Sequence, residues 1–186
     1  MDIDVFDVEK VFRERLASSM GLDKYQYIME QVNITNVAVD TDFQRTFNGF
    51  YRVRRNESWR KLYYEYFESV KNSKPTFEEI VTYLYENTGN IELSFSSKML
   101  ATILPEKPIW DRYVIEKLNV QLTGATKKEK MDNAFSIYSN IEKQYSDFLK
   151  AENGKECINE FDRMLPDYKE ISSVKKIDSI IWSMRS

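Results

Sequence analysis

The sequence predicts an all-α protein, and three observations carry this prediction. Apolar side chains recur at helical spacing along most of the chain. Glycine and proline, which interrupt helices, are few, at five and four of 186 residues. The stretch rich in β-branched residues, 33–40, is short and is predicted to be a loop. We therefore expect one globular domain over residues 1–186, built from about eight to ten helices.

The first part of the chain contains predicted helices separated by recognisable breaks. The first helix is expected to end at Gly21, and a turn or two of helix is expected from Thr41 to Asn48. The clearest pattern is a wide apolar stripe on residues 59–70, which the polar breaker 72–75 ends. The apolar positions behind these predictions are Val5, Val8, Phe12 and Leu16 in the first helix, Tyr25, Ile28, Met29 and Val32 in the second, and Trp59, Leu62, Tyr63, Tyr66, Phe67 and Val70 in the striped one.

Capping residues bound the helices that follow. Thr76 and Glu79 have the spacing of a capping box, and Gly89 suits a left-handed cap at the other end of that helix. Further on, a long helix is expected after the polar connection 123–126. The pair 153–154 is expected to separate it from a shorter helix that Pro166 closes, and a last helix follows. Their inward positions are Phe77, Ile80, Val81, Leu84 and Tyr85, then Ala134, Ile137, Tyr138, Ile141, Tyr145 and Phe148, then Cys157, Ile158, Phe161 and Leu165, and finally Val174, Ile177, Ile180, Ile181 and Met184, with Trp182 on the flank.

Composition excludes several classes of function. The chain has no histidine, which rules out histidine-assisted hydrolases and zinc sites that use imidazole. Its lone cysteine, Cys157, excludes an internal disulfide and a cysteine-cluster metal site. The acidic N-terminus is unlike a targeting segment, and no apolar run is long enough to cross a membrane. We expect a cytoplasmic protein without a cofactor, a bound metal or a membrane partner.

Basic residues cluster in one segment of a chain whose net charge is −3. The aromatic residues Phe50 and Tyr51 lie within this segment beside its arginines, a combination that suits a phosphate backbone with stacked bases. The same cations also suit ion pairs with the many surface acids, and the sequence leaves both interpretations open. The segment contains the single acid Glu57 and the cations Arg45, Arg52, Arg54, Arg55, Arg60 and Lys61.

The segment Ser94–Leu118, SFSSKMLATILPEKPIWDRYVIEKL, is the most specific in the chain. It predicts a short helix, a turn bounded by prolines, and a second helix with Asp111 at its start. Residues 94–101 and 109–114 resemble the helix-hairpin-helix element and the following segment of DNA glycosylases of the archaeal and bacterial 8-oxoguanine type. Serines stand where that family has its two hairpin glycines, and Tyr113 stands where it has a histidine.

The resemblance implies an all-α fold of the helix-hairpin-helix glycosylase class and base-excision chemistry on DNA. In that family the hairpin holds a DNA phosphate and the target base is rotated out of the stack. Lys98 would then be the nucleophile and Asp111 the essential carboxylate. The resemblance places Ser94, Phe95, Ser96 and Ser97 at the hairpin. Candidate nucleic-acid contacts are then Arg112 and, from the basic segment, Arg52, Arg54 and Arg55, with Trp110 as the candidate for stacking on the extruded base.

Simpler interpretations stand beside these roles. Asp111 has the position of a helix cap, Lys98 that of a solvated lysine, and Trp110, next to Pro108, that of a core aromatic. The alternative function is a non-catalytic helical module that binds nucleic acid or a protein partner. A metal-dependent nuclease finds little support, because no strand-borne pair of carboxylates is predicted.

Overall fold

The structure is a computed structural model that describes residues 1, 3–14 and 21–184. These residues form helices and connecting loops with no strand, which confirms the predicted all-α class. None of the described helices is long and apolar enough to span a bilayer. The chain divides into two compact units, which we call the central unit, Gly21–Leu104, and the terminal unit, Met1–Met20 with Pro105–Ser186.

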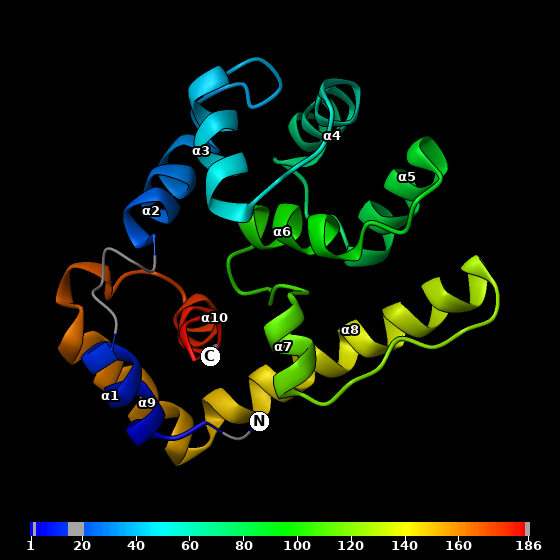
Figure 1. The fold of residues 1–186 in the computed structure, drawn as a ribbon. Helices are drawn as coiled ribbons and strands as arrows, with labels where there is room; N and C mark the ends of the chain where they lie inside the picture. The colour runs from blue at the N-terminus through cyan, green and yellow to red at the C-terminus, as the bar shows by residue number, and fades with distance from the viewer. Residues whose placement is uncertain (2, 15–20, 185–186) are drawn as a thin grey trace. The chain divides into compact units, whose positions relative to one another are not determined.

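The central unit contains five helices, whose arrangement Figure 1 shows. Aromatic side chains pack between them. Rings of Phe43, Phe47, Tyr63, Tyr64 and Phe67 lie against one another with centroids about 5–6 Å apart. Each of these five residues is fully buried, so together they form the centre of the unit. The helices are α2 (Leu22–Gln31), α3 (Thr41–Tyr51), α4 (Glu57–Val70), α5 (Phe77–Thr88) and α6 (Leu93–Ile103).

The helix α3 is longer than its sequence pattern predicts. Phe43, Phe47 and Tyr51 recur every four residues and are all buried, so the helix continues until its third aromatic residue reaches the core. Arg52 then takes a left-handed conformation, with φ 54°, and ends the helix. The length of α3 is therefore set by the tertiary packing of these rings, which the local sequence pattern does not reveal.

The predicted caps of α5 are confirmed. The Thr76 side chain accepts a hydrogen bond from the Glu79 amide, and the Glu79 carboxylate accepts one from the Thr76 amide. At the other end Gly89 has φ 72°, the left-handed angle that glycine adopts most readily. These two signals fix the bounds of the helix from the sequence alone.

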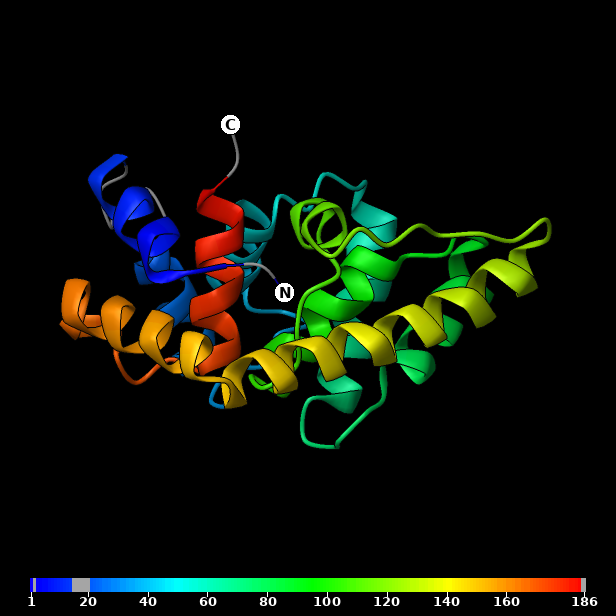
Figure 2. The same cartoon turned by 90° about the horizontal axis from the view of Figure 1, so that it is seen from below.

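The terminal unit surrounds one central helix, α10. Every residue from Val174 to Ile181 is buried, so α10 is covered on all sides. Helices α1 and α9 pack on it and on each other, and α8 continues into α9 (Figure 2). The elements of this unit are α1 (Val5–Glu14), α7 (Arg112–Lys117), α8 (Lys127–Lys150), α9 (Glu152–Met164), the short 3-10 helix η2 (Pro166–Tyr168) and α10 (Ser173–Ser183).

Three details differ from the sequence predictions or lie outside the described residues. The division between α8 and α9 falls at Ala151, and Asn153 and Gly154 lie inside the first turn of α9. The backbone at Gly154 approaches the backbone of Phe148 so closely that only glycine fits, because a Cβ at this position would collide with the Phe148 carbonyl oxygen. Gly21 has a left-handed φ of 70° and precedes α2, whereas Leu16 lies outside the described residues.

Candidate nucleic-acid interface

The segment Ser94–Leu118 has the predicted order of helix, turn and helix. The turn between α6 and α7 contains Pro105 and Pro108, and Asp111 is the N-cap of α7. Within the terminal unit the turn is held from two sides. Ser172 donates a 2.6 Å hydrogen bond to the Pro105 carbonyl, and the Tyr138 hydroxyl donates one of 2.7 Å to the Pro108 carbonyl. The chain entering α7 is therefore firmly positioned.

Residues 94–97, which the resemblance places in a hairpin turn, lie in the predicted short helix. These residues form the first turns of α6, and the Ser96 amide donates to the Glu92 carbonyl oxygen as in a regular helix. Serine reaches left-handed backbone angles less readily than the glycines of a hairpin, so the helix continues through this position. Ser96 and Ser97 are buried, and the Ser97 hydroxyl donates to the Ser94 carbonyl oxygen. A phosphate cannot reach the amides of these two buried serines in this conformation.

Lys98 is half-buried, and its ammonium group contacts the end of α3. Its Nζ donates a 3.2 Å hydrogen bond to the Tyr51 carbonyl oxygen, at the end of α3. The ammonium also lies 5.3 Å from the centre of the Phe95 ring and 6.0 Å from that of Tyr51. Lys98 thus joins α6 to the last turn of α3, where a cation stabilises free carbonyl groups.

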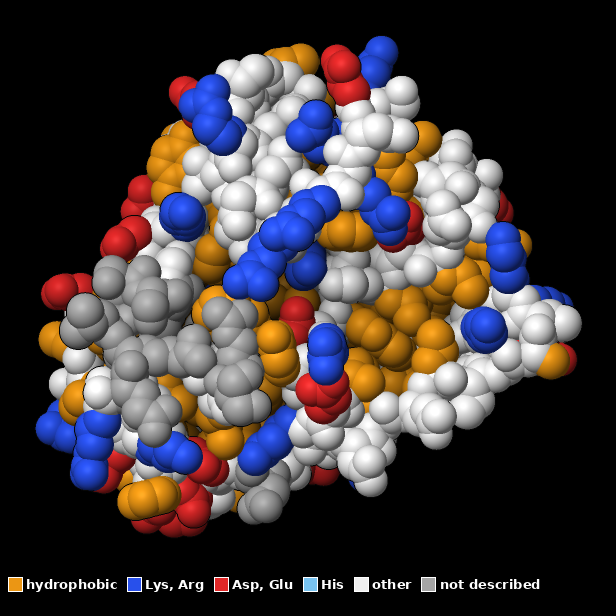
Figure 3. Space-filling view, in the orientation of Figure 1, with side chains coloured by type: hydrophobic (Ala, Val, Ile, Leu, Met, Phe, Trp, Pro, Cys, Tyr) orange, Lys and Arg blue, Asp and Glu red, His pale blue; other side chains and the backbone are white. Residues whose placement is uncertain are grey.

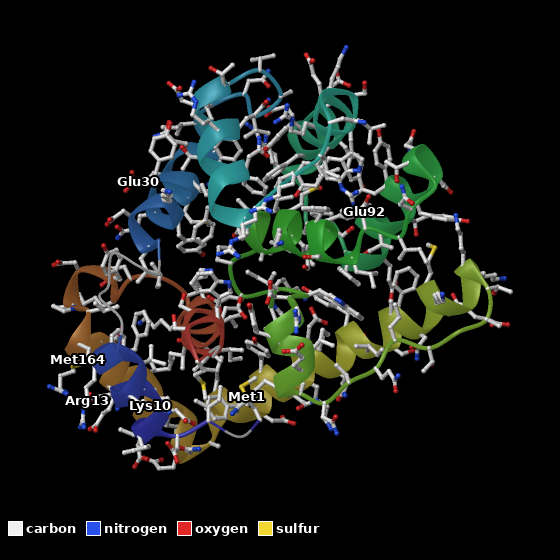
Figure 4. All side chains as sticks on the ribbon, in the orientation of Figure 1. Met1, Lys10, Arg13, Glu30, Glu92 and Met164 are labelled. Atoms are coloured by element: carbon white, nitrogen blue, oxygen red, sulfur yellow. The ribbon has the colours of Figure 1, made fainter. Side chains whose placement is uncertain are left out.

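The structure brings part of the basic segment next to Phe95. The guanidinium carbon of Arg55 lies 5.2 Å from the centre of the Phe95 ring and 5.5 Å from that of Trp59. Arg55 also forms a 2.7 Å ion pair with Glu92, which is almost fully buried at the start of α6 and is labelled in Figure 4. We call Arg55, Trp59, Glu92, Phe95 and Lys98 the Phe95 cluster. Two regions 40 residues apart in the sequence meet in it.

The remaining cations of the basic segment are largely exposed. Arg52 and Arg54 are exposed in the loop between α3 and α4, and Lys61 is exposed on α4. Within the described part of the chain, neither Arg54 nor Arg60 forms an ion pair, whereas Arg45 pairs with Asp42. In the space-filling view, lysine and arginine side chains gather where Figure 1 draws the end of α3 and α6 (Figure 3). The central unit therefore carries a local cationic patch, although the whole chain is acidic.

Asp111 serves as a helix cap. Its Oδ1 accepts a 2.9 Å hydrogen bond from the Tyr113 amide, and the side chain is half-buried. Trp110, also half-buried, precedes it on the turn. Arg112 is exposed and pairs with Glu116 one turn further on, which raises the pKa of its guanidinium. Asp111 and Arg112 belong to the terminal unit, whereas Lys98, Arg52, Arg54 and Arg55 belong to the central unit.

A buried ionisable pair lies beside Asp111, and the sequence analysis missed it. Lys175 and Asp178, on α10, are both less than a tenth exposed. Burial raises the pKa of Asp178 to about 7, with a smaller contribution from Asp111, and burial lowers the pKa of Lys175. The Tyr145 hydroxyl donates a 2.6 Å hydrogen bond to Asp178 Oδ1. A signal was present in the sequence, since Lys175 and Asp178 lie one turn apart among the apolar positions Val174, Ile177, Ile180 and Ile181 of the last predicted helix.

Glu92 is the second residue that sequence reasoning missed. It precedes an apolar helix, a position typical of a solvated capping residue, and nothing in the local pattern indicates that it is buried.

Among the described residues, no group of three or more cysteine, aspartate or glutamate side chains is placed to hold a metal ion. Comparison with known proteins finds no matching protein-family model, no matching curated protein and no matching solved structure.

Proposed function

We propose that this chain binds DNA through the exposed arginines between α3 and α4 and through the adjoining Phe95 cluster. The observation that carries the proposal is the placement of three exposed arginines, Arg52, Arg54 and Arg55, on one short loop. The guanidinium of Arg55 lies against the rings of Trp59 and Phe95. Cations supply contacts to phosphates, and aromatic side chains next to them supply stacking to bases. Because the chain as a whole has a net charge of −3, the gathering of positive charge on this one loop favours an anionic partner at this place.

The direct test measures binding of fluorescent duplex and single-stranded oligonucleotides at several salt concentrations. The combined variant Arg52→Ala, Arg54→Ala and Arg55→Ala removes three cations from the proposed surface. If each cation contacts a phosphate, the slope of log K against log salt decreases by about 2–3, and binding at moderate salt falls at least tenfold. Unchanged binding by this variant overturns the proposal.

A matched control removes the same charge from the terminal unit. Lys127, Lys128 and Lys130 are exposed at the start of α8, and their replacement by alanine also removes three positive charges. We expect this control to bind DNA nearly as the wild type does. Equal losses of DNA affinity in both variants indicate a general effect of net charge. If the wild-type protein binds no oligonucleotide, a protein partner remains as the alternative.

Base excision at Asp111 is the second candidate function. It is favoured by the half-buried carboxylate of Asp111 at the start of α7 and by the ionisable pair Lys175 and Asp178 beside it. Oligonucleotides that carry damaged or modified bases test this candidate, with wild-type protein and Asp111→Asn compared directly. Asparagine caps a helix about as well as aspartate, so this variant removes the charge and preserves the fold. Equal base release by the two proteins removes Asp111 from the mechanism.

Trapping with borohydride tests the amine. A lysine that attacks the sugar carbon forms an imine, which borohydride reduces to a stable covalent adduct with the oligonucleotide. The variant Lys98→Met tests whether the adduct depends on Lys98. An adduct that persists in this variant assigns the amine to another residue, and the absence of both base release and adduct in the wild type leaves DNA binding as the function.

A further inference from the structure

We propose that Glu92 is a positioning residue that holds Arg55 in the orientation in which its guanidinium binds a DNA phosphate. This inference rests on the proposed DNA-binding function and goes beyond it by separating Arg55 from the other cations of the segment. Arg55 is the arginine of the loop whose side chain is held by a buried carboxylate and two aromatic rings. Its role is therefore geometric as well as electrostatic.

The environment of Glu92 is consistent with this single role. Glu92 occupies the N-cap position of α6, yet its side chain caps no amide of that helix. Its Oε2 accepts the hydrogen bond from Arg55 Nη2, whereas its buried Oε1 has no hydrogen-bond partner among the described residues. A carboxylate that only capped or solvated the helix would not be buried in this way. The positive end of the α6 dipole makes its negative charge tolerable at this position.

The Arg55 side chain is held but not enclosed. About 40% of it is exposed, against 4% of the Glu92 side chain. A guanidinium carries five N–H donors in a planar fork, and the ion pair with Glu92 uses Nη2. The rings of Trp59 and Phe95 lie within cation–π distance and limit its rotation. Donors held in this way lose less conformational entropy when a phosphate binds.

The experiment exploits the sign of the charge. Glu92→Gln and Glu92→Met each remove one negative charge from a DNA-binding surface, so electrostatics alone predicts tighter binding. If Glu92 positions Arg55, both variants bind DNA more weakly, in the order wild type, Glu92→Gln, Glu92→Met, with a loss of about tenfold for methionine. Binding as tight as wild type or tighter in both variants overturns the inference.

A matched control removes a negative charge that makes no contact with Arg55. Glu57, in the first turn of α4, is exposed and is the single acid of the basic segment. Glu57→Gln is expected to bind DNA as tightly as wild type or up to about threefold more tightly, because it reduces repulsion without disturbing the Phe95 cluster. A loss in this control equal to that of the Glu92 variants attributes their effect to charge removal in general and overturns the inference.

Arg55→Lys keeps the test decisive if a Glu92 variant fails to fold. Lysine preserves the charge but lacks the planar fork, so a positioned guanidinium predicts about a tenfold loss of affinity. Wild-type affinity in Arg55→Lys overturns the inference, because only the charge is then used. Failure of the proposed function has a different signature, since the wild-type protein itself then shows no salt-dependent binding.

Discussion

The hydroxyl of Tyr145 donates a hydrogen bond to Oδ1 of Asp178 inside the terminal unit, and both side chains are buried. Lys175 and Asp111 are the charged groups that contribute to the electrostatics of Asp178. Burial raises the pKa of Asp178 from 3.8 to about 7, so in the native state the carboxyl is protonated below neutral pH. This arrangement makes the stability of the protein depend on pH.

Asp178→Asn tests this dependence. Between pH 4 and 7 the native state of the wild type holds a proton on Asp178 that the unfolded state does not, so its contribution to stability is full below about pH 4 and is lost as the pH rises to about 7. Since one pKa unit corresponds to about 1.4 kcal/mol, the contribution changes by about 4 kcal/mol over this range. Asparagine retains the acceptor for Tyr145 and removes the titration.

The measurement is urea unfolding of both proteins at several pH values. The free energy of unfolding of the wild type relative to the variant is expected to rise steadily as the pH is lowered from 7 to 4. Groups elsewhere in the protein contribute equally to both curves and cancel in the difference. A flat difference over this range contradicts the raised pKa of Asp178.

Asp111 also contributes to stability as the cap of α7. Asp111→Ala is expected to lower the free energy of unfolding by about 1 kcal/mol, because the Tyr113 amide loses its acceptor. Asp111→Asn is expected to change the free energy of unfolding by only a few tenths of a kcal/mol, because asparagine caps a helix about as well as aspartate. Thermal melts of the two variants check the difference. Equal melting temperatures for alanine and asparagine variants show that the cap is not needed.

Lys98→Met tests the bond between α6 and α3. Methionine fills similar space but cannot donate to the Tyr51 carbonyl oxygen, so we expect a loss of about 1–2 kcal/mol in the free energy of unfolding. Lys61→Met is a suitable control, because Lys61 is exposed and its nearest carboxylate is 3.9 Å away. Chemical denaturation of the two variants gives the comparison. An equal effect in both proteins assigns no structural role to Lys98.

Two glycines in helices predict opposite effects of alanine. In Gly154→Ala the new Cβ meets the backbone of Phe148, so the chain must shift, and we expect destabilisation by about 1–3 kcal/mol. In Gly49→Ala the new Cβ meets no atom within 4 Å, so the better helix propensity of alanine stabilises the protein by about 0.5–1 kcal/mol. Urea unfolding distinguishes the two signs. Stabilisation by Gly154→Ala contradicts the close approach at the start of α9.

Local signals predicted much of the helical framework. The capping box at Thr76 and Glu79, the stripe on α4 and the left-handed glycine after α5 depend on neighbours within four residues, which a sequence displays directly. The order of helix, turn and helix around Asp111 is confirmed for the same reason. Residues 94–97 belong to the predicted short helix and do not form the hairpin turn that the resemblance implies, since the serines there reach left-handed angles less readily than glycines.

The candidate site depends on contacts between distant residues. The sequence identifies a cluster of arginines, but nothing near Arg55 indicates that Glu92, 37 residues later, is its partner. Similarly, the burial of Lys175 and Asp178 follows from the position of α10 at the centre of its unit. Periodicity cannot report such relations, since it describes one helix at a time. The roles of the candidate residues on DNA stay predictions.

Composition and periodicity were enough to establish that this chain is helical, lacks the side chains for imidazole chemistry and concentrates positive charge between residues 45 and 61. The tertiary structure decided which of those arginines forms an ion pair with a buried carboxylate and which buried groups have a shifted pKa. It placed the arginine at position 55 on a buried glutamate, and it placed a lysine and an aspartate where water does not reach. The reason is physical: helix formation depends on hydrogen bonds four residues apart, whereas ion pairing and desolvation depend on whatever the folded chain brings into contact.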